Sequence, residues 1–213
     1  MLVKERMTTK NLITVTKDID IESAYKVMRK HSIRHLPVVE GKKLIGIVTD
    51  RDLRQSLIPW KSSEKEREFY YFSKEVRIEE IMTKDPVTIT PDTDIEDAAR
   101  LIHRYKFGAL PVVKDGNLVG IITHMDILEI FIEIMGIIGS SKRIDVIFGK
   151  KPKGFEEVSK IIEDNKGEII SIGMSSEKNK NKRAYYFRIE TDNLDGIIKT
   201  LKEKKYKILD VMR

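Results

Sequence analysis

The sequence lacks cysteine and long apolar runs. Without cysteine among its 213 residues, the chain cannot hold a disulfide framework, a cysteine zinc site or a thiol nucleophile. The longest apolar run, Ile127 to Ile138, contains Glu129 and Glu133 and falls short of the roughly 20 residues that span a bilayer. The first residues contain no apolar segment of the kind found in signal peptides. We therefore expect a cytoplasmic protein that does not enter a membrane.

The sequence also offers few candidates for catalytic or metal-binding residues. The four histidines are scattered and lack the close spacing of a metal site. No residue trio stands out as a nucleophile with its base. The paired acids Asp18/Asp20 and Asp92/Asp94 suit helix N-caps better than Mg²⁺ ligands. The sequence therefore predicts neither a catalytic residue nor a metal ligand.

What the sequence does contain is an internal repeat. The segment HLPVVEGKKLIGIVTDRDL, from His35 to Leu53, recurs as ALPVVKDGNLVGIITHMDI, from Ala109 to Ile127, at an offset of 74 residues. The match continues upstream of both segments without a gap. Because a single copy would leave an apolar face exposed, two copies predict a module with pseudo-two-fold symmetry.

Each copy has the pattern of a βαββα unit. A short extended piece precedes an Asp-rich helix start, and two β-rich runs joined by a turn follow the helix. The turn is Glu40-Gly41 in the first copy and Lys114 to Asn117 in the second, which is a strong hairpin signal. A further helix is expected to begin at Asp50 and at His124.

The C-terminal part has a different pattern. Alternating runs predict strands at 143–148, 168–174, 183–190 and 206–212, and apolar residues at helical spacing predict helices at 152–165 and 193–205. The order is βαββαβ, which is the ferredoxin-like pattern. The fold class expected for the whole chain is therefore mixed α+β, with two βαββα repeats followed by this smaller domain.

The duplicated pattern LPVV…LxGIhT…D, in which h is aliphatic, resembles the CBS domain. The tail resembles an ACT domain in its βαββαβ order and in Gly154-Phe155 at the first strand–helix junction. Tandem CBS repeats followed by an ACT domain, with an aromatic-ended linker, resemble the acetoin utilisation protein B family. The domains that this resemblance implies are residues 1–54 and 77–139 for the two CBS repeats, 55–76 for the linker between them, and 143–213 for the ACT-like domain.

The CBS resemblance implies a non-catalytic regulatory protein that binds an adenine nucleotide in clefts between its repeats. AMP, ADP and ATP are the expected ligands, with NAD and S-adenosylmethionine as alternatives. In the pattern G-h-h-T-x-x-D, a hydroxyl and a helix N-terminus suit a phosphate, and the carboxylate can accept both ribose hydroxyls. Alternatively, Thr and Asp only cap the following helix. The residues concerned are Gly46, Thr49 and Asp52 in the first copy and Gly120, Thr123 and Asp126 in the second.

The same resemblance implies how the base and the phosphates are held. Adenine would lie between aliphatic side chains, with its edge near backbone groups at Thr14 and Thr88, and cations near the centre would decide the number of phosphates. The first copy is richer in such cations, so we expect two unequal sites. The residues expected around the base are Val15, Ile33, His35 and Leu36 in one cleft and Ile89, Phe107, Ala109 and Leu110 in the other. The candidate cations are Arg34, His35, Arg51, Arg104, Lys106 and His124.

The helix expected from Asp126 to Gly139 is apolar on nearly all sides. Such a helix either belongs to the core of the chain or forms the subunit interface of a homodimer. The CBS resemblance favours the interface. The ACT resemblance implies an amino acid as a second ligand. A regulatory role also implies a protein partner, which the sequence does not identify.

The net charge of +6 makes a nucleic-acid-binding protein the alternative function. Residues 143–213 carry 17 Lys and Arg against 12 Asp and Glu, so nearly all of the excess lies in the tail. Any nucleic-acid contact would therefore use the basic C-terminal domain, and the repeat module is almost neutral. An enzyme acting on nucleotides is a third candidate, disfavoured by the missing nucleophile–base pair.

Overall fold

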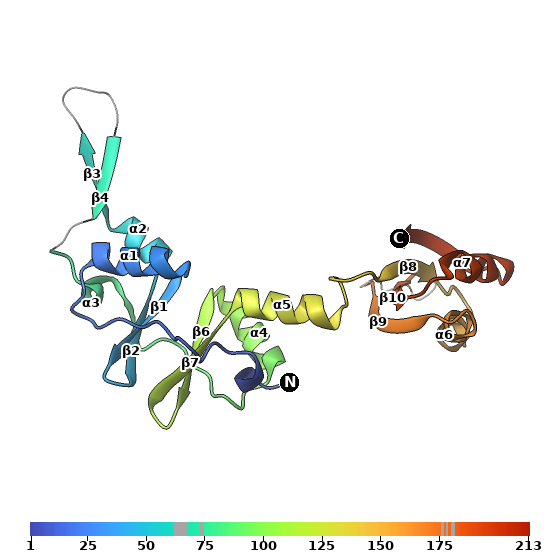
Figure 1. Ribbon diagram of the computed structural model, residues 1–213, viewed down its shortest axis with the longest axis horizontal. Coiled ribbons are helices and arrows are strands. Elements are labelled where there is room, and N and C mark those ends of the chain that lie inside the picture. Colours follow the sequence, from blue (N-terminus) through green and yellow to red (C-terminus); the bar gives the residue numbers. More distant parts are fainter. Residues whose placement is uncertain (62–67, 73–74, 176, 178, 180–181) are drawn as a thin grey trace. The chain divides into compact units, whose positions relative to one another are not determined.

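The fold is described from a computed structural model, which describes residues 1–61, 68–72, 75–175, 177, 179 and 182–213. The chain divides into two compact units, Met1–Ile127 and Leu128–Arg213 (Figure 1). Helix α5 (His124–Ile134) begins in the first unit and ends in the second.

The first unit contains both repeats, and each has the expected elements at corresponding positions. The first repeat comprises α1 (Ile21–His31), β1 (His35–Glu40), β2 (Lys43–Thr49) and α2 (Asp50–Gln55). The second comprises α4 (Ile95–Tyr105), β6 (Ala109–Lys114), β7 (Asn117–Thr123) and the start of α5. The extended pieces expected at 13–16 and 87–89 form single parallel bridges, Val15 to Val38 and Ile89 to Val112.

Aspartates begin the first helix of each repeat, as the sequence predicts. Asp20 is the N-cap of α1, and its carboxylate accepts a hydrogen bond from the Ser23 backbone N–H at 2.9 Å. Asp94 occupies the same position before α4. Both helices also end alike, because Ser32 and Lys106 adopt left-handed backbone conformations with φ of 53° and 59°. The left-handed residue ends each helix and turns the chain toward the next strand, β1 or β6.

The two hairpins share one sheet. Its order is β1-β2-β7-β6, and the short strand β5 (Thr83–Lys84) pairs with β2. The registers of the two hairpins are equivalent, since His35 pairs with Thr49 and Ala109 pairs with Thr123. The two repeats meet in this sheet through the pairing of Lys43 with Asn117.

Each repeat is completed by the segment that precedes the other repeat. The N-terminal residues form the 3-10 helix η1 (Val3–Glu5), and Thr8 exchanges backbone hydrogen bonds with Ile121 of β7 at 2.9 and 3.1 Å. In the same way, α3 (Ile78–Ile81) and β5 pack on the first repeat, where Ile78 N–H donates to Ile19 O at 3.0 Å. The repeats therefore exchange their leading segments.

The segment expected to be a linker contains a β-hairpin. Strands β3 (Leu57–Lys61) and β4 (Glu68–Phe72) pair antiparallel. Phe72 packs on Tyr25 of α1 with ring centroids 4.7 Å apart, so the end of the hairpin contacts the first repeat. Residues 62–67 and 73–74 of the expected linker lie outside the described residues.

The second unit has the βαββαβ order that the sequence predicts. A four-stranded antiparallel sheet of order β11-β8-β10-β9 packs against two helices around a core that includes Val146, Phe187 and Ile197. This arrangement is the ferredoxin-like pattern. The elements are β8 (Lys142–Ile147), α6 (Gly154–Asp164), β9 (Glu168–Met174), β10 (Ala184–Glu190), α7 (Leu194–Glu203) and β11 (Lys207–Met212).

Helix α5 differs from a buried core helix. Ile130 is buried, but Leu128, Phe131 and Ile134 are 45%, 53% and 59% exposed. The interpretation of this helix as internal core is therefore wrong, because one side of it is apolar and exposed.

Candidate functional site

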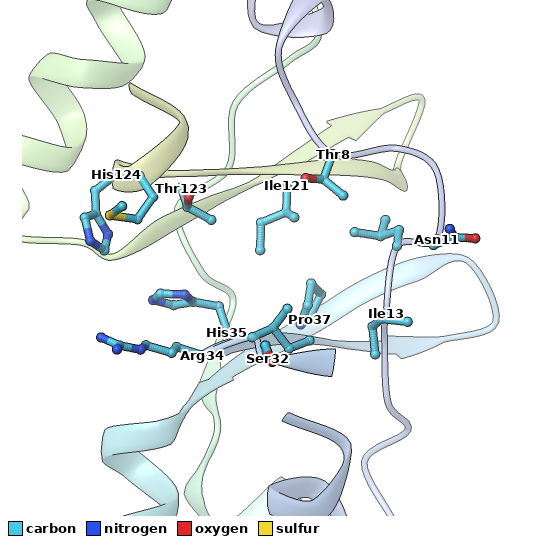
Figure 2. Close-up of a pocket in the computed structure, with 13 residues that line it drawn as sticks. Thr8, Asn11, Ile13, Ser32, Arg34, His35, Pro37, Ile121, Thr123 and His124 are labelled. Carbon is cyan, nitrogen blue, oxygen red and sulfur yellow. The ribbon is translucent and has the colours of Figure 1, made fainter. Parts of the chain in front are cut away.

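A cavity of about 400 Å³ lies in the first unit, where the two repeats meet (Figure 2). It takes its walls from the exchanged N-terminal segment, the start of β1, the end of β7 and the first turn of α5. Its lining residues are Thr8, Asn11, Leu12, Ile13, Ser32, Ile33, Arg34, His35, Pro37, Ile121, Thr123, His124 and Met125.

Three basic side chains gather at one end of the cavity. Figure 2 shows Arg34 and His35 approaching from the first repeat and His124 from the second, with Asn11 and Ile13 at the far end. The cation set therefore combines both repeats. This pairing differs from the expectation that each cleft draws on one copy.

Hydrogen bonds to Gly108 fix the position of His124. The backbone N–H of His124 donates to Gly108 O at 3.0 Å, and ring atom Nδ1 lies 2.9 Å from the same oxygen. Because a carbonyl can only accept, Nδ1 carries the proton. Atom Nε2 is then the ring nitrogen available to a ligand.

His35 is half-buried beside this histidine. Burial lowers the pKa of His35 below its ordinary value of 6.5, and the neighbouring charge of His124 lowers it further. The ring has room because residue 108 is glycine: a Cβ there would lie 2.2 Å from His35 Nε2. The burial and the neighbouring charge both favour the neutral form of His35.

The opposite part of the cavity is mainly apolar. Leu12, Ile13, Pro37 and Ile121 present aliphatic surface, and Asn11 adds an amide at the rim. A flat apolar ring suits such walls, because burial of its faces is favourable and a few polar groups can fix its orientation.

The expected threonine and aspartate pairs form matching capping arrangements. In the first repeat, Asp52 Oδ2 accepts hydrogen bonds from the Thr49 backbone N–H and hydroxyl, both at 2.8 Å. In the second, Asp126 Oδ2 accepts from the Thr123 N–H at 2.6 Å and the Thr123 hydroxyl at 2.8 Å. Capping is therefore established for both pairs, and in each pair both hydrogen bonds use one oxygen.

Five of the expected nucleotide-binding residues line the cavity: Ile33, Arg34, His35, Thr123 and His124. The others lie outside the lining of this cavity. Leu36 and Leu110 are fully buried in the sheet, Val15 and Ile89 are buried at its bridges, and Ala109 is buried in a cluster with Ile47 and Ile121.

Gly46 and Gly120, the two glycines of the G-h-h-T-x-x-D pattern, lie against methionine side chains. A Cβ at Gly46 would lie 2.5 Å from Met82 Sδ, and one at Gly120 would lie 2.8 Å from Met7 Sδ. The glycines therefore make room for the exchanged segments. The remaining expected residues outside the cavity lining are Thr14, Thr49, Arg51, Asp52, Phe107 and Asp126, together with the candidate cations Arg104 and Lys106.

Sequence reasoning missed eight lining residues. Thr8 was missed because it pairs with Ile121, which is far away in the sequence, so no local pattern predicts the contact. One signal existed: Met7-Thr8 recurs as Met82-Thr83, just outside the aligned repeat. The other missed residues are Asn11, Leu12, Ile13, Ser32, Pro37, Ile121 and Met125.

The part of the chain that the structure describes contains neither a candidate metal site nor a membrane-spanning helix. No group of three or more His, Asp or Glu side chains there could hold a metal ion. Among the same residues, no helix is long and apolar enough to cross a membrane.

Comparison with known proteins supports the repeat. A family model described as CBS domain matches residues 3–58 and 78–133, together just over half of the chain. Among curated proteins, a CBS domain-containing protein of Dictyostelium discoideum is 34% identical over 137 residues, which cover 63% of this chain and 94% of that protein. An inosine-5'-monophosphate dehydrogenase of Korarchaeum cryptofilum is 36% identical over 126 residues, 58% of this chain, but the match covers only 23% of that enzyme.

Solved structures match the same part of the chain. A CBS domain pair in complex with 5'-methylthioadenosine and S-adenosyl-L-methionine has a TM-score of 0.50 at 33% identity and covers 62% of this chain and 95% of its own. CBSX2 in complex with AMP has a TM-score of 0.50 at 28% identity, with coverages of 62% and 97%. A Vibrio cholerae protein described as an acetoin utilization protein has a TM-score of 0.52 at 30% identity, with coverages of 64% and 94%.

Proposed function

Because this chain belongs to the CBS domain family, we propose that its paired repeats bind an adenine nucleotide and serve a regulatory, non-catalytic role. The observation that carries the proposal is the cavity between the repeats, which has aliphatic walls at one end and three basic side chains at the other. A nucleotide has the same division into an apolar base and an anionic group.

Similar proteins support the ligand class. AMP is bound in the CBSX2 structure, and 5'-methylthioadenosine and S-adenosyl-L-methionine are bound in another CBS pair. All three molecules contain adenosine. We therefore propose an adenosine-containing ligand here, with AMP, ADP or ATP ahead of NAD and S-adenosylmethionine.

We place the base among Ile13, Pro37 and Ile121, and the ribose near Thr123. In this arrangement Asp126 Oδ1 would accept ribose hydroxyls, because Oδ2 is engaged in capping. The corresponding residues around Thr49, Asp52, Phe107 and Ala109 would form a second, unequal cleft. Its different side chains support the expectation of unequal affinities.

The origin of the cavity walls supports a regulatory role. Since both repeats contribute, a ligand that prefers one relative position of the repeats would shift their equilibrium. The proposed domains are residues 1–54, 77–139 and 143–213, with 143–213 as an ACT-like module that receives or adds a signal. Its βαββαβ order supports this assignment.

Calorimetry with AMP, ADP, ATP, NAD, S-adenosylmethionine and 5'-methylthioadenosine tests the proposal. We expect saturable binding by at least one of them and a rise in thermal unfolding temperature. Ile13→Trp should fill the apolar end and abolish binding, whereas Leu209→Trp, on exposed strand β11 outside the cavity, should leave it unchanged. No binding by any ligand at millimolar concentration would overturn the proposal.

A further inference from the structure

The second unit carries its charges unevenly along its sheet. At one end of the sheet β8 finishes while β10 and β11 begin, because Ile147 pairs with both Ala184 and Lys207. Helix α6 begins and α7 finishes beside this end, since α6 follows β8 and α7 precedes β11. We call this end the basic pole, because the connections that meet there are rich in lysine.

Two of these connections supply most of the charge at the basic pole. Residues 148–154, between β8 and α6, read FGKKPKG, and residues 202–207, from the end of α7 into β11, read KEKKYK. Together they carry seven lysines and one glutamate. Lys182 and Arg183 add two more cations from the turn before β10. The topology therefore brings lysines that are far apart in the sequence to one end of the sheet.

The opposite end of the sheet has the reverse charge. Glu168 lies directly across from Glu190 in the pairing of β9 with β10, and Asp164 and Asp192 line hollows at the same end. These four carboxylates outnumber the lysines that line the same hollows, Lys142 and Lys166. A polyanion would therefore be attracted to the basic pole and repelled from the opposite end.

Contacts between the two lysine-rich connections hold the basic pole together. Lys151 Nζ donates to Lys204 O and lies 3.7 Å from the centre of the Tyr206 ring. Lys204 Nζ in turn lies 3.0 Å from Glu157 Oε1. These two lysines are therefore structural. The others in the two connections are exposed and form no ion pair with any residue that the structure describes: Lys150, Lys153, Lys202, Lys205 and Lys207.

An exposed aromatic ring lies beside the basic pole. Phe155 follows Lys153 by two residues and is 48% exposed, and its ring centroid lies 6.2 Å from that of the buried Phe187. The core supports the ring from one side, so the ring offers surface without projecting from the domain. A supported ring suits stacking with a nucleobase, whereas binding to a bilayer uses apolar groups that enter it.

We propose that the basic pole binds single-stranded nucleic acid, with its exposed lysines on the phosphates and Phe155 stacked on a base. Lysine contacts a phosphate as a point charge, and phosphate contacts read no base edge, so we expect little sequence preference. The proposal goes beyond the nucleotide function of the repeats and uses none of their residues.

Fluorescence anisotropy of the full chain with labelled oligo(dT) and oligo(U) tests the proposal. The affinity is measured at several salt concentrations between about 50 and 200 mM. We expect the logarithm of the association constant to fall linearly with the logarithm of salt concentration, with a slope of about −0.7 for each phosphate contacted. Five exposed lysines therefore predict a slope of up to about −3.5.

Neutralising substitutions locate the site. Lys150→Gln, Lys153→Gln and Lys202→Gln combined should make the slope shallower by about 2 and weaken binding at least about tenfold at low salt. The matched control removes the same charge from exposed positions in the first unit and should leave binding unchanged. It combines Lys30→Gln, Lys42→Gln and Lys114→Gln. Unfolding temperatures verify that both triple variants are folded.

Substitutions of Phe155 test the stacking contact. Phe155→Leu keeps an apolar side chain but removes the aromatic face, so it should weaken binding about fivefold or more without changing the salt slope. Phe155→Tyr keeps the ring and should retain the affinity. Together the two variants separate stacking from plain apolar contact.

The outcomes are distinguishable. Absence of oligonucleotide binding at low salt, equal weakening by both lysine triples, or unchanged binding by Phe155→Leu would overturn the inference. Vesicles of phosphatidylserine and phosphatidylcholine are the alternative probe, and binding to them without binding to either oligonucleotide would also overturn it. The proposed function is tested with adenosine ligands in the first unit, so failure of either proposal leaves the other standing.

Discussion

The ring of His35 occupies the space that a side chain at Gly108 would need. A Cβ at position 108 would lie 2.2 Å from His35 Nε2, although the two residues belong to different repeats. Gly108→Ala must therefore move the ring, and we expect a loss of about 1 kcal/mol in the free energy of unfolding from the displaced rotamer. Chemical denaturation measures this change. In a His35→Ala background the same substitution should cost almost nothing, and an equal loss in both backgrounds would contradict the contact.

A second prediction concerns the glycines that face the exchanged segments. Gly46→Ala and Gly120→Ala would each bring a Cβ within 3.0 Å of a backbone oxygen, that of Thr83 and that of Thr8 respectively. A backbone atom cannot turn aside as a side chain can, so we expect each substitution to lower the free energy of unfolding by about 1–3 kcal/mol. Urea denaturation measures this quantity. Unchanged denaturation midpoints would show that Thr83 and Thr8 do not pack against Gly46 and Gly120.

The capping pairs allow a test that separates stability from ligand binding. Asp52→Ala and Asp126→Ala should each cost about 0.5–2 kcal/mol in unfolding free energy, because each removes the acceptor of two hydrogen bonds at a helix start. Only Asp126 lies beside a cavity-lining threonine, Thr123. Asp126→Ala should therefore also weaken adenosine binding in this cavity. Equal effects of both variants on binding would remove Asp126 from the ribose site.

The repeat explains how much of the fold was predictable. Local signals are sufficient for each hairpin and its flanking helices: the turns at Gly41 and Gly116, Asp20 and Asp94 at the N-cap positions, and alternating apolar strands. The two hairpins consequently have equivalent registers. The βαββαβ order of the second unit was predictable because it too depends on local hydrophobic periodicity.

The cavity was only partly predictable, because it depends on which repeat supplies which wall. The offset aligns Arg34 with Gly108 and Asp50 with His124, but it does not show that Arg34 and His124 line the same cavity. That pairing is a tertiary relationship between segments far apart in the chain. For the same reason, the glycines were expected against a ligand and lie instead against methionines from the exchanged segments.

Alkaline pH should reveal a buried phenol in the second unit. The Tyr206 hydroxyl donates to Glu157 Oε2, and Lys204 Nζ lies 3.0 Å from Oε1 of the same carboxylate. Burial, followed by the hydrogen bond to this carboxylate, raises the pKa of Tyr206 above its ordinary 10.0. A raised pKa in the folded state means that its stabilising contribution is present below the unfolded pKa and is lost as the pH rises toward the folded value. Stability should therefore decline above about pH 10.

Tyr206→Phe tests this linkage. The variant should lose the hydrogen bond at neutral pH, and its unfolding temperature should decline less steeply than that of the wild type above pH 10. Tyr105→Phe is the matched control, because Tyr105 is 50% exposed. Parallel alkaline profiles for the wild type and Tyr206→Phe would show that Tyr206 does not contribute to the pH dependence.

The exposed side of α5 predicts self-association. Leu128, Phe131 and Ile134 follow one another at a spacing of three residues, each is at least 45% exposed, and Met125 extends the row by one turn toward the N-terminus. A row of large apolar side chains on one helix costs free energy in water unless another surface covers it. We propose that a second copy of the chain packs against this row, so that the protein is a homodimer.

Sedimentation velocity tests the dimer. Phe131→Glu places a charge in the middle of the row and should shift the protein toward the monomer, with the dissociation constant raised at least about a hundredfold for the loss of a central aromatic contact. Glu129→Lys, on the same helix but outside the row, is the control and should leave the mass unchanged. A wild-type protein that sediments as a monomer at micromolar concentration would contradict the proposal, and Phe131→Glu would then affect neither mass nor nucleotide binding.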